Sequence, residues 1–106
     1  MRSVVALTAL LLTSSLASAQ DVPQVKRGEA LLIRNCAMCH AVGRTGASPH
    51  AQAPEFRTLS RRYKIEALAE ALGEGIISGH PDMPEFRFSA GDVGAVLAYL
   101  ESIQER

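Results

Sequence analysis

The residues best suited to chemistry in this 106-residue chain lie in one short run, Cys36-Ala37-Met38-Cys39-His40. The run has the form C-x-x-C-H, which is the attachment sequence for c-type haem. Residues three apart share one face of a helix, so each thiol can form a thioether with one of two neighbouring haem vinyl groups. His40 follows directly and is placed to bind the iron as its proximal ligand. The motif therefore predicts covalently attached haem c.

Three other uses of the two cysteines compete with haem attachment. C-x-x-C can be a redox dithiol of the thioredoxin type, but no βαβ pattern surrounds it here. A structural zinc site needs four ligands, and His50 or His80 could complete such a set, although without a recognisable spacing. The pair could also form a plain disulfide. The adjacent His40, an export signal and the small core available to a short chain favour haem over all three.

An electron-carrying haem needs a second axial ligand, and a soft thioether in that place stabilises ferrous iron. The chain has three methionines. Met1 belongs to the predicted leader, and Met38 lies inside the attachment motif on the same side of the iron as His40. Met83 remains, in a loop stiffened by a proline on either side. We therefore predict Met83 as the distal ligand, with His80 as its competitor.

The first nineteen residues have the order of a secretory signal peptide. Arg2 supplies a positive charge, Val4 to Leu12 is apolar apart from one threonine, and Ala17-Ser18-Ala19 is a small-x-small cleavage site. An uncleaved membrane anchor is the alternative, but the uncharged stretch falls short of the roughly 20 mostly apolar residues of a span. The cleavage point has no cysteine to which a lipid could be attached. We expect residues 1–19 to be a signal peptide and residues 20–106 an exported, periplasmic domain without a membrane span.

Length and charge narrow the class of protein further. A chain of this size forms one domain, and its core is marginal unless a cofactor or crosslink supports it. Its 11 basic side chains balance 11 acidic ones, giving a formal net charge of zero. This balance gives no indication of a nucleic-acid partner or of binding to an acidic membrane surface.

Apolar residues recur at helical spacing in three stretches, 25–40, 65–76 and 89–103. Ser89 with Asp92 three residues later is typical of a helix start, and glycines weaken the middle stretch toward its end. No stretch alternates as a strand would. These patterns predict an all-α domain.

Two segments between the predicted helices lack helical periodicity. The first runs from His40 to Tyr63 and contains two glycines and two prolines, and the second, residues 79–88, contains two prolines that rule out a continuous helix. A loop as long as the first is uncommon in a compact domain unless it is functional. We expect a bound cofactor to give these segments something to wrap around.

The chain resembles the small bacterial class I cytochromes c from about Val25 to Ile103. The resemblance is carried by the haem motif and by three further features, which are Gly28 with Leu32, the run from Met83 to Phe86, and the run from Val96 to Leu100. It implies a class I cytochrome c fold of about three to four helices wrapped around one covalently bound haem. In that family the first and last helices cross near right angles, and a glycine of the first helix contacts an aromatic residue of the last. Gly28 and Tyr99 match those two positions.

The resemblance also implies roles for residues that follow the motif. In such proteins a proline carbonyl accepts a hydrogen bond from the proximal histidine, which fixes the ring and raises its basicity. Pro54 matches that proline, with Phe56 against the haem, and Pro49 is the alternative. One of three side chains, Arg57, Arg61 or Tyr63, could hydrogen-bond a haem propionate. The alternative for the two arginines is that they are solvated loop charges.

The function implied is that of a periplasmic one-electron carrier, a monomer that exchanges electrons with redox proteins of a respiratory or dehydrogenase chain. The alternative is an accessory haem subunit of a periplasmic dehydrogenase or oxidase complex. No acid–base or nucleophile constellation indicates a freestanding enzyme. Lys26 and Lys64 are the only lysines, so the chain lacks the lysine-ringed haem edge of the mitochondrial relatives. Its one basic cluster comprises Arg57, Arg61, Arg62 and Lys64.

Overall fold

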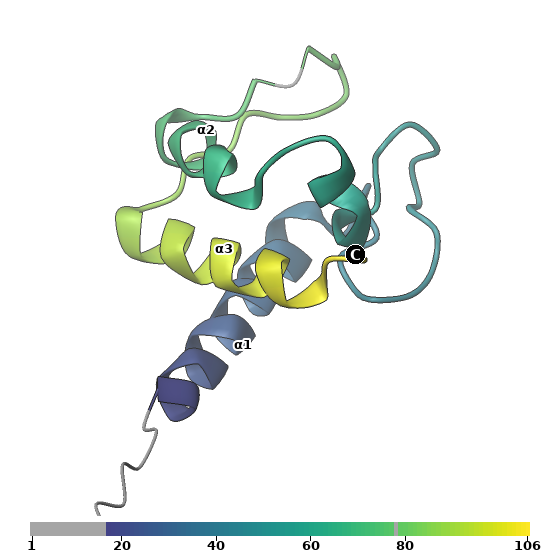
Figure 1. The fold of residues 1–106 in the computed structure, drawn as a ribbon. Helices are drawn as coiled ribbons and strands as arrows, with labels where there is room; N and C mark the ends of the chain where they lie inside the picture. Colours follow the sequence, from purple (N-terminus) through teal and green to yellow (C-terminus); the bar gives the residue numbers. More distant parts are fainter. Residues whose placement is uncertain (1–16, 78) are drawn as a thin grey trace, which may run out of the picture.

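The computed structural model describes residues 17–77 and 79–106, so the predicted leader lies almost entirely outside the described residues. The described part of the chain is helical and contains no strand, which confirms the all-α prediction (Figure 1). Its elements in chain order are α1 (Ala17–Cys36), the 3-10 helices η1 (Phe56–Arg61) and η2 (Ile65–Ala67), α2 (Leu68–Glu74) and α3 (Ala90–Ile103).

The first and last helices, α1 and α3, cross each other (Figure 1). Gly28 is buried at the crossing, where a Cβ atom would overlap the carbonyl oxygen of Ala95 and lie 2.9 Å from the Cβ of Tyr99. Only a residue without a side chain allows the two backbones to approach so closely. The predicted contact between Gly28 and Tyr99 is confirmed.

The core is centred on α3, which contributes buried residues along its whole length. Val96, in the middle of that helix, is completely buried. The other elements pack around it and supply most of the remaining core. The core cluster comprises Leu32, Val42, Phe56, Leu59, Ile65, Leu72, Val93, Val96, Tyr99, Leu100 and Ile103.

Single residues explain where α3 begins and where α2 ends. The Ser89 side chain accepts a hydrogen bond of 3.2 Å from the backbone N–H of Asp92, which caps α3 as its sequence predicts. Gly75 follows α2 with φ at +121°, a conformation that side chains rarely adopt, and so ends that helix.

The structure differs from the sequence prediction at the end of α1. The helix ends at Cys36 rather than continuing to His40. The backbone N–H groups of Cys39 and His40 still donate to the carbonyl of Cys36, at 3.2 and 2.9 Å. The haem motif therefore runs from the last residue of α1 into one further turn.

Each of the two segments without helical periodicity contains local structure or a contact to a helix. η1 lies within the first of them, a short 3-10 helix that periodicity alone did not reveal. The second segment is joined to α2 at its C-terminal end, where the N–H of Phe88 donates to the carbonyl of Leu72 at 2.8 Å. Both segments leave the helical body as extended loops (Figure 1). Among the described residues, no helix is long and apolar enough to cross a membrane.

Candidate haem-binding site

The two cysteines of the motif are free thiols and half-buried. Burial and, to a smaller extent, the nearby Cys39 together raise the pKa of the Cys36 thiol to about 11. A thiol with so high a pKa is protonated at neutral pH and lacks the thiolate character of redox dithiols. This environment therefore argues against the thioredoxin-type alternative and leaves both sulfur atoms available for thioether bonds.

The ring of His40 is held by a backbone carbonyl. Its Nδ1 lies 2.8 Å from the carbonyl oxygen of Pro54. A carbonyl only accepts hydrogen bonds, so Nδ1 carries the proton and Nε2 keeps the lone pair that a metal ion needs. It is Pro54, and not Pro49, that makes this contact.

Phe56 covers one side of the same ring. Its aromatic ring lies against that of His40, with centroids 4.6 Å apart and planes tilted by 30°. The backbone N–H of Phe56 donates to the carbonyl of Ala41 at 3.0 Å, which pins the residue next to the motif. The segment that follows the long loop thus supports the imidazole both by hydrogen bonding and by packing.

Met83 lies in the second loop, in a turn closed by a bond of 3.2 Å from its N–H to the carbonyl of His80. Its side chain is half-buried and lines a recess of about 380 Å³ together with Ile76, Ile77 and Pro81. Met38, in contrast, is 89 % exposed. Of these two methionines, Met83 is the one placed beside a cavity.

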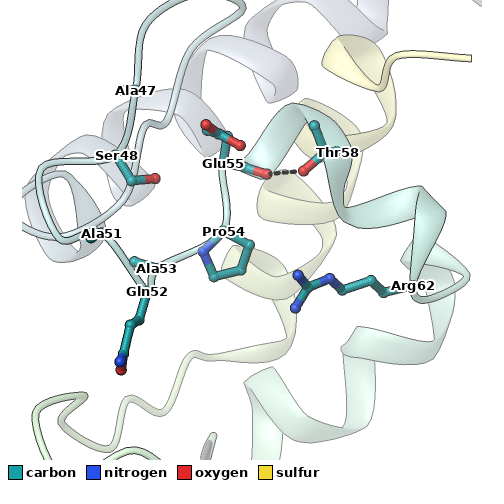
Figure 2. Close-up of a pocket in the computed structure, with 9 residues that line it drawn as sticks. All are labelled: Ala47, Ser48, Ala51, Gln52, Ala53, Pro54, Glu55, Thr58 and Arg62. Atoms are coloured by element: carbon teal, nitrogen blue, oxygen red, sulfur yellow. Dashed lines mark hydrogen bonds between the residues drawn. The ribbon is translucent and has the colours of Figure 1, made fainter.

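A second recess, of about 410 Å³, lies beside Pro54 (Figure 2). Thr58 and Arg62 line it from the far side, and the Arg62 guanidinium extends toward Pro54, whereas the Glu55 carboxylate points away from Arg62. A recess therefore lies beside the loop of Met83 and another beside Pro54, the residue that supports His40.

The three candidate propionate partners are placed differently from Arg62. Arg57 and Arg61 both pair with the Glu105 carboxylate, at 3.2 and 3.0 Å, and Arg57 also donates to the carbonyl of Gly46 at 2.7 Å. Tyr63 is half-exposed. Arg62 makes no side-chain hydrogen bond or ion pair to any described residue. Sequence reasoning placed Arg62 only in the basic cluster, because adjacent arginines cannot be told apart by spacing.

His50 is half-buried and contacts two other segments of the chain. Its Nε2 lies 3.5 Å from the Asp82 carboxylate, and its backbone N–H donates to the carbonyl of Cys39 at 3.1 Å. It therefore connects the segment after the motif to the loop of Met83. Across residues 17–77 and 79–106, no three His, Cys, Asp or Glu side chains gather as a metal site would require.

These residues fit a covalently attached haem. The donor set offers two free thiols three residues apart, an imidazole with Nε2 free and a thioether beside a recess. When bound, haem c supplies one-electron chemistry at its iron. The thiols would hold its edge, and His40 and Met83 would face its iron.

Comparison with known proteins shows the family to which the chain belongs. Residues 23–100 match the family described as cytochrome c oxidase, cbb3-type, subunit III. Cytochrome c-552 of Bradyrhizobium diazoefficiens is 32 % identical over 104 residues, which cover 98 % of this chain and 95 % of that protein. No solved structure matches the chain. The chain thus belongs to the c-type cytochromes, as a small monohaem, all-α, electron-carrying member with covalently attached haem c.

Proposed function

We propose that this cytochrome is a periplasmic one-electron carrier whose iron is bound by His40 and Met83. The observation that carries the proposal is the hydrogen bond of 2.8 Å between His40 Nδ1 and the carbonyl of Pro54. It fixes the tautomer in which Nε2 can bind iron, and it makes the imidazole a stronger donor.

Met83 is the better of the two candidates for the opposite axial position. Both residues line the same recess, but Met83 is half-buried there, whereas His80 is exposed. A thioether ligand favours ferrous iron and so raises the reduction potential, which suits a carrier of respiratory electrons. The flanking prolines restrict the backbone on both sides of Met83 and hold its side chain in a narrow range of positions.

With His40 and Met83 both bound to the haem iron, small oxidants would be kept away from the metal. Peroxide or dioxygen chemistry would need an open coordination position, which His40 and Met83 together withhold. The chain therefore acts as a carrier rather than as a catalyst at iron. Its partners are the redox proteins that donate and accept the electron, and it works as a monomer.

Carbon monoxide binding to the reduced holoprotein tests this ligand set. Wild-type protein should bind it slowly or not at all at neutral pH, and Met83→Ala should bind it readily and lose the weak sulfur-to-iron absorption band of the oxidised form. Met38→Ala is the matched control, because that methionine is 89 % exposed, and it should behave as the wild type. Rapid, stoichiometric binding by the wild type would refute the proposal, and an unchanged Met83→Ala spectrum would transfer the ligand to His80.

A permanent haem subunit is the second candidate, since the matching family is itself described as an oxidase subunit. The described part of the chain lacks a membrane-crossing helix of its own, so such an association would depend on protein contacts. Size-exclusion chromatography of a gently prepared periplasmic extract separates the two roles. Haem absorbance at the mass of the single chain supports the carrier, and co-elution with a dehydrogenase or oxidase supports the subunit.

A further inference from the structure

The side-chain amide of Gln104, immediately after α3, joins three backbone groups of two elements. Its Nε2 donates to the carbonyls of Phe56 and Leu100, at 2.7 and 2.8 Å, and its Oε1 accepts from the N–H of Ser60 at 2.8 Å. A glutamine amide has two N–H donors, and both are used. Gln104 thus ties the first and fifth residues of η1 to the last turn of α3.

Phe56 connects this tie to the proximal side of the haem site. Gln104 holds its carbonyl, and the carbonyl of Ala41, the residue after His40, accepts from its N–H at 3.0 Å. Its ring lies 4.6 Å from that of His40 between centroids. Since both backbone polar groups of Phe56 are fixed, the position of its ring beside the imidazole depends on both bonds.

We propose that Gln104 is a positioning residue that acts through Phe56 to hold the His40 imidazole in one orientation. The proposal rests on the proposed function, in which His40 binds the iron. The hydrogen bond to Pro54 fixes one ring nitrogen but leaves the imidazole free to turn about that bond. The Phe56 ring restricts the turn, and groups that orient a ligating histidine tune the metal it binds.

The neighbouring Glu105 attaches η1 by a different kind of contact. Its carboxylate pairs with the exposed Arg61 and with Arg57, whose side chain is 16 % exposed, and its N–H donates to the carbonyl of Arg57 at 2.8 Å. Exposed ion pairs contribute little and are screened by salt. The bonds of Gln104 to Phe56 and Leu100 are neutral and half-buried, so the positioning effect should persist at high ionic strength.

Proton NMR of the oxidised holoprotein tests the proposal, because the hyperfine shifts of the haem methyl and His40 ring protons depend on how the axial ligands are oriented. Gln104→Met keeps the length of the side chain and removes all three hydrogen bonds. We expect it to change the spread of the haem methyl shifts at low and at high salt. Gln24→Met, the same change on α1 away from η1, should leave the shifts unchanged.

Ile103→Val separates positioning from stability. It removes buried volume from the residue before Gln104 and should lower the thermal midpoint without moving the hyperfine shifts. If Gln104→Met likewise lowers only the thermal midpoint, Gln104 is merely structural and the proposal is wrong. If Gln104→Met does not fold, Gln104→Glu takes its place, because it keeps an acceptor for the N–H of Ser60 but loses the donors to Phe56 and Leu100. We expect this variant to change the haem methyl shifts. Shifts identical to those of the wild type would overturn the proposal. Carbon monoxide binding by the wild type tests the ligand set separately.

Discussion

The hydroxyl of Tyr99 donates a hydrogen bond of 2.8 Å to the carbonyl of Val42, two residues after the predicted proximal ligand His40. The bond is buried and joins residues 57 apart in the chain. On its other side Tyr99 meets Gly28 at the helix crossing. One side chain therefore connects α3, α1 and the segment that leaves the haem motif.

Tyr99→Phe tests the contribution of this bond to stability. The variant keeps the ring at the helix crossing but leaves the buried carbonyl of Val42 without its partner, which should cost about 1–3 kcal/mol of unfolding free energy. Denaturant unfolding of the holoprotein measures the loss. Tyr63→Phe is the control, because Tyr63 is 51 % exposed, and an equal loss in both variants would contradict the assigned role.

The same side chain predicts a pH dependence of stability. Burial raises the pKa of Tyr99 above its ordinary value, and the Glu29 carboxylate raises it further. The folded state therefore favours the protonated phenol, whose contribution is fully present below the unfolded pKa near 10 and is lost as the pH rises through the folded pKa. Between pH 10 and 12 the wild type should lose more stability than Tyr99→Phe. Parallel loss in thermal melts of the two proteins would show that Tyr99 is not the group responsible.

Gly28→Ala should strongly destabilise the helix crossing. The added Cβ would overlap the carbonyl of Ala95, a backbone atom that cannot move without separating α1 from α3, and such overpacking typically costs about 1–3 kcal/mol. Gly91→Ala is the matched control, since nothing lies within 4 Å of its Cβ position in α3. That variant should be neutral or slightly stabilised by better helix propensity. Thermal unfolding compares the pair, and similar midpoints would contradict the close crossing.

Arg62→Gln should alter the charge around the haem, if its guanidinium meets a propionate in the recess beside Pro54. Removing a positive charge favours ferric iron and so lowers the reduction potential, and it raises the pKa of the propionate. The potential should then vary with pH near neutrality, as redox titrations at several pH values would reveal. Arg61→Gln is the control, because Arg61 pairs with Glu105. An identical response of both variants would exclude a specific role for Arg62.

Export predicts a definite mass for the mature protein. Removal of residues 1–19 after Ala17-Ser18-Ala19 should leave a chain that begins at Gln20 and carries one covalently bound haem. Intact-mass spectrometry of a periplasmic extract checks both features together. A membrane-bound protein that retains Met1 would contradict the signal-peptide prediction.

The sequence by itself determined the parts of this protein whose chemistry is local. Two thiols three residues apart and the histidine that follows identify haem attachment, helical periodicity predicts an all-α domain, and Ser89 with Asp92 predicts the start of α3. These features depend on neighbours in the chain, so spacing is sufficient to recognise them. The prediction that the first helix continues to His40 was wrong, because α1 ends at Cys36, whose carbonyl is shared by the N–H groups of Cys39 and His40.

Only the tertiary structure decided which distant groups support the motif. Pro54 rather than Pro49 meets His40, because the path of the intervening loop sets which carbonyl faces the ring. Glu105 engages Arg57 and Arg61, and Gln104 holds η1, because the end of α3 returns to a segment more than forty residues earlier. The family resemblance had favoured Pro54, but the pairings of Gln104 and Glu105 depend on how the core closes and not on the spacing of residues along the chain, so no sequence pattern predicted them.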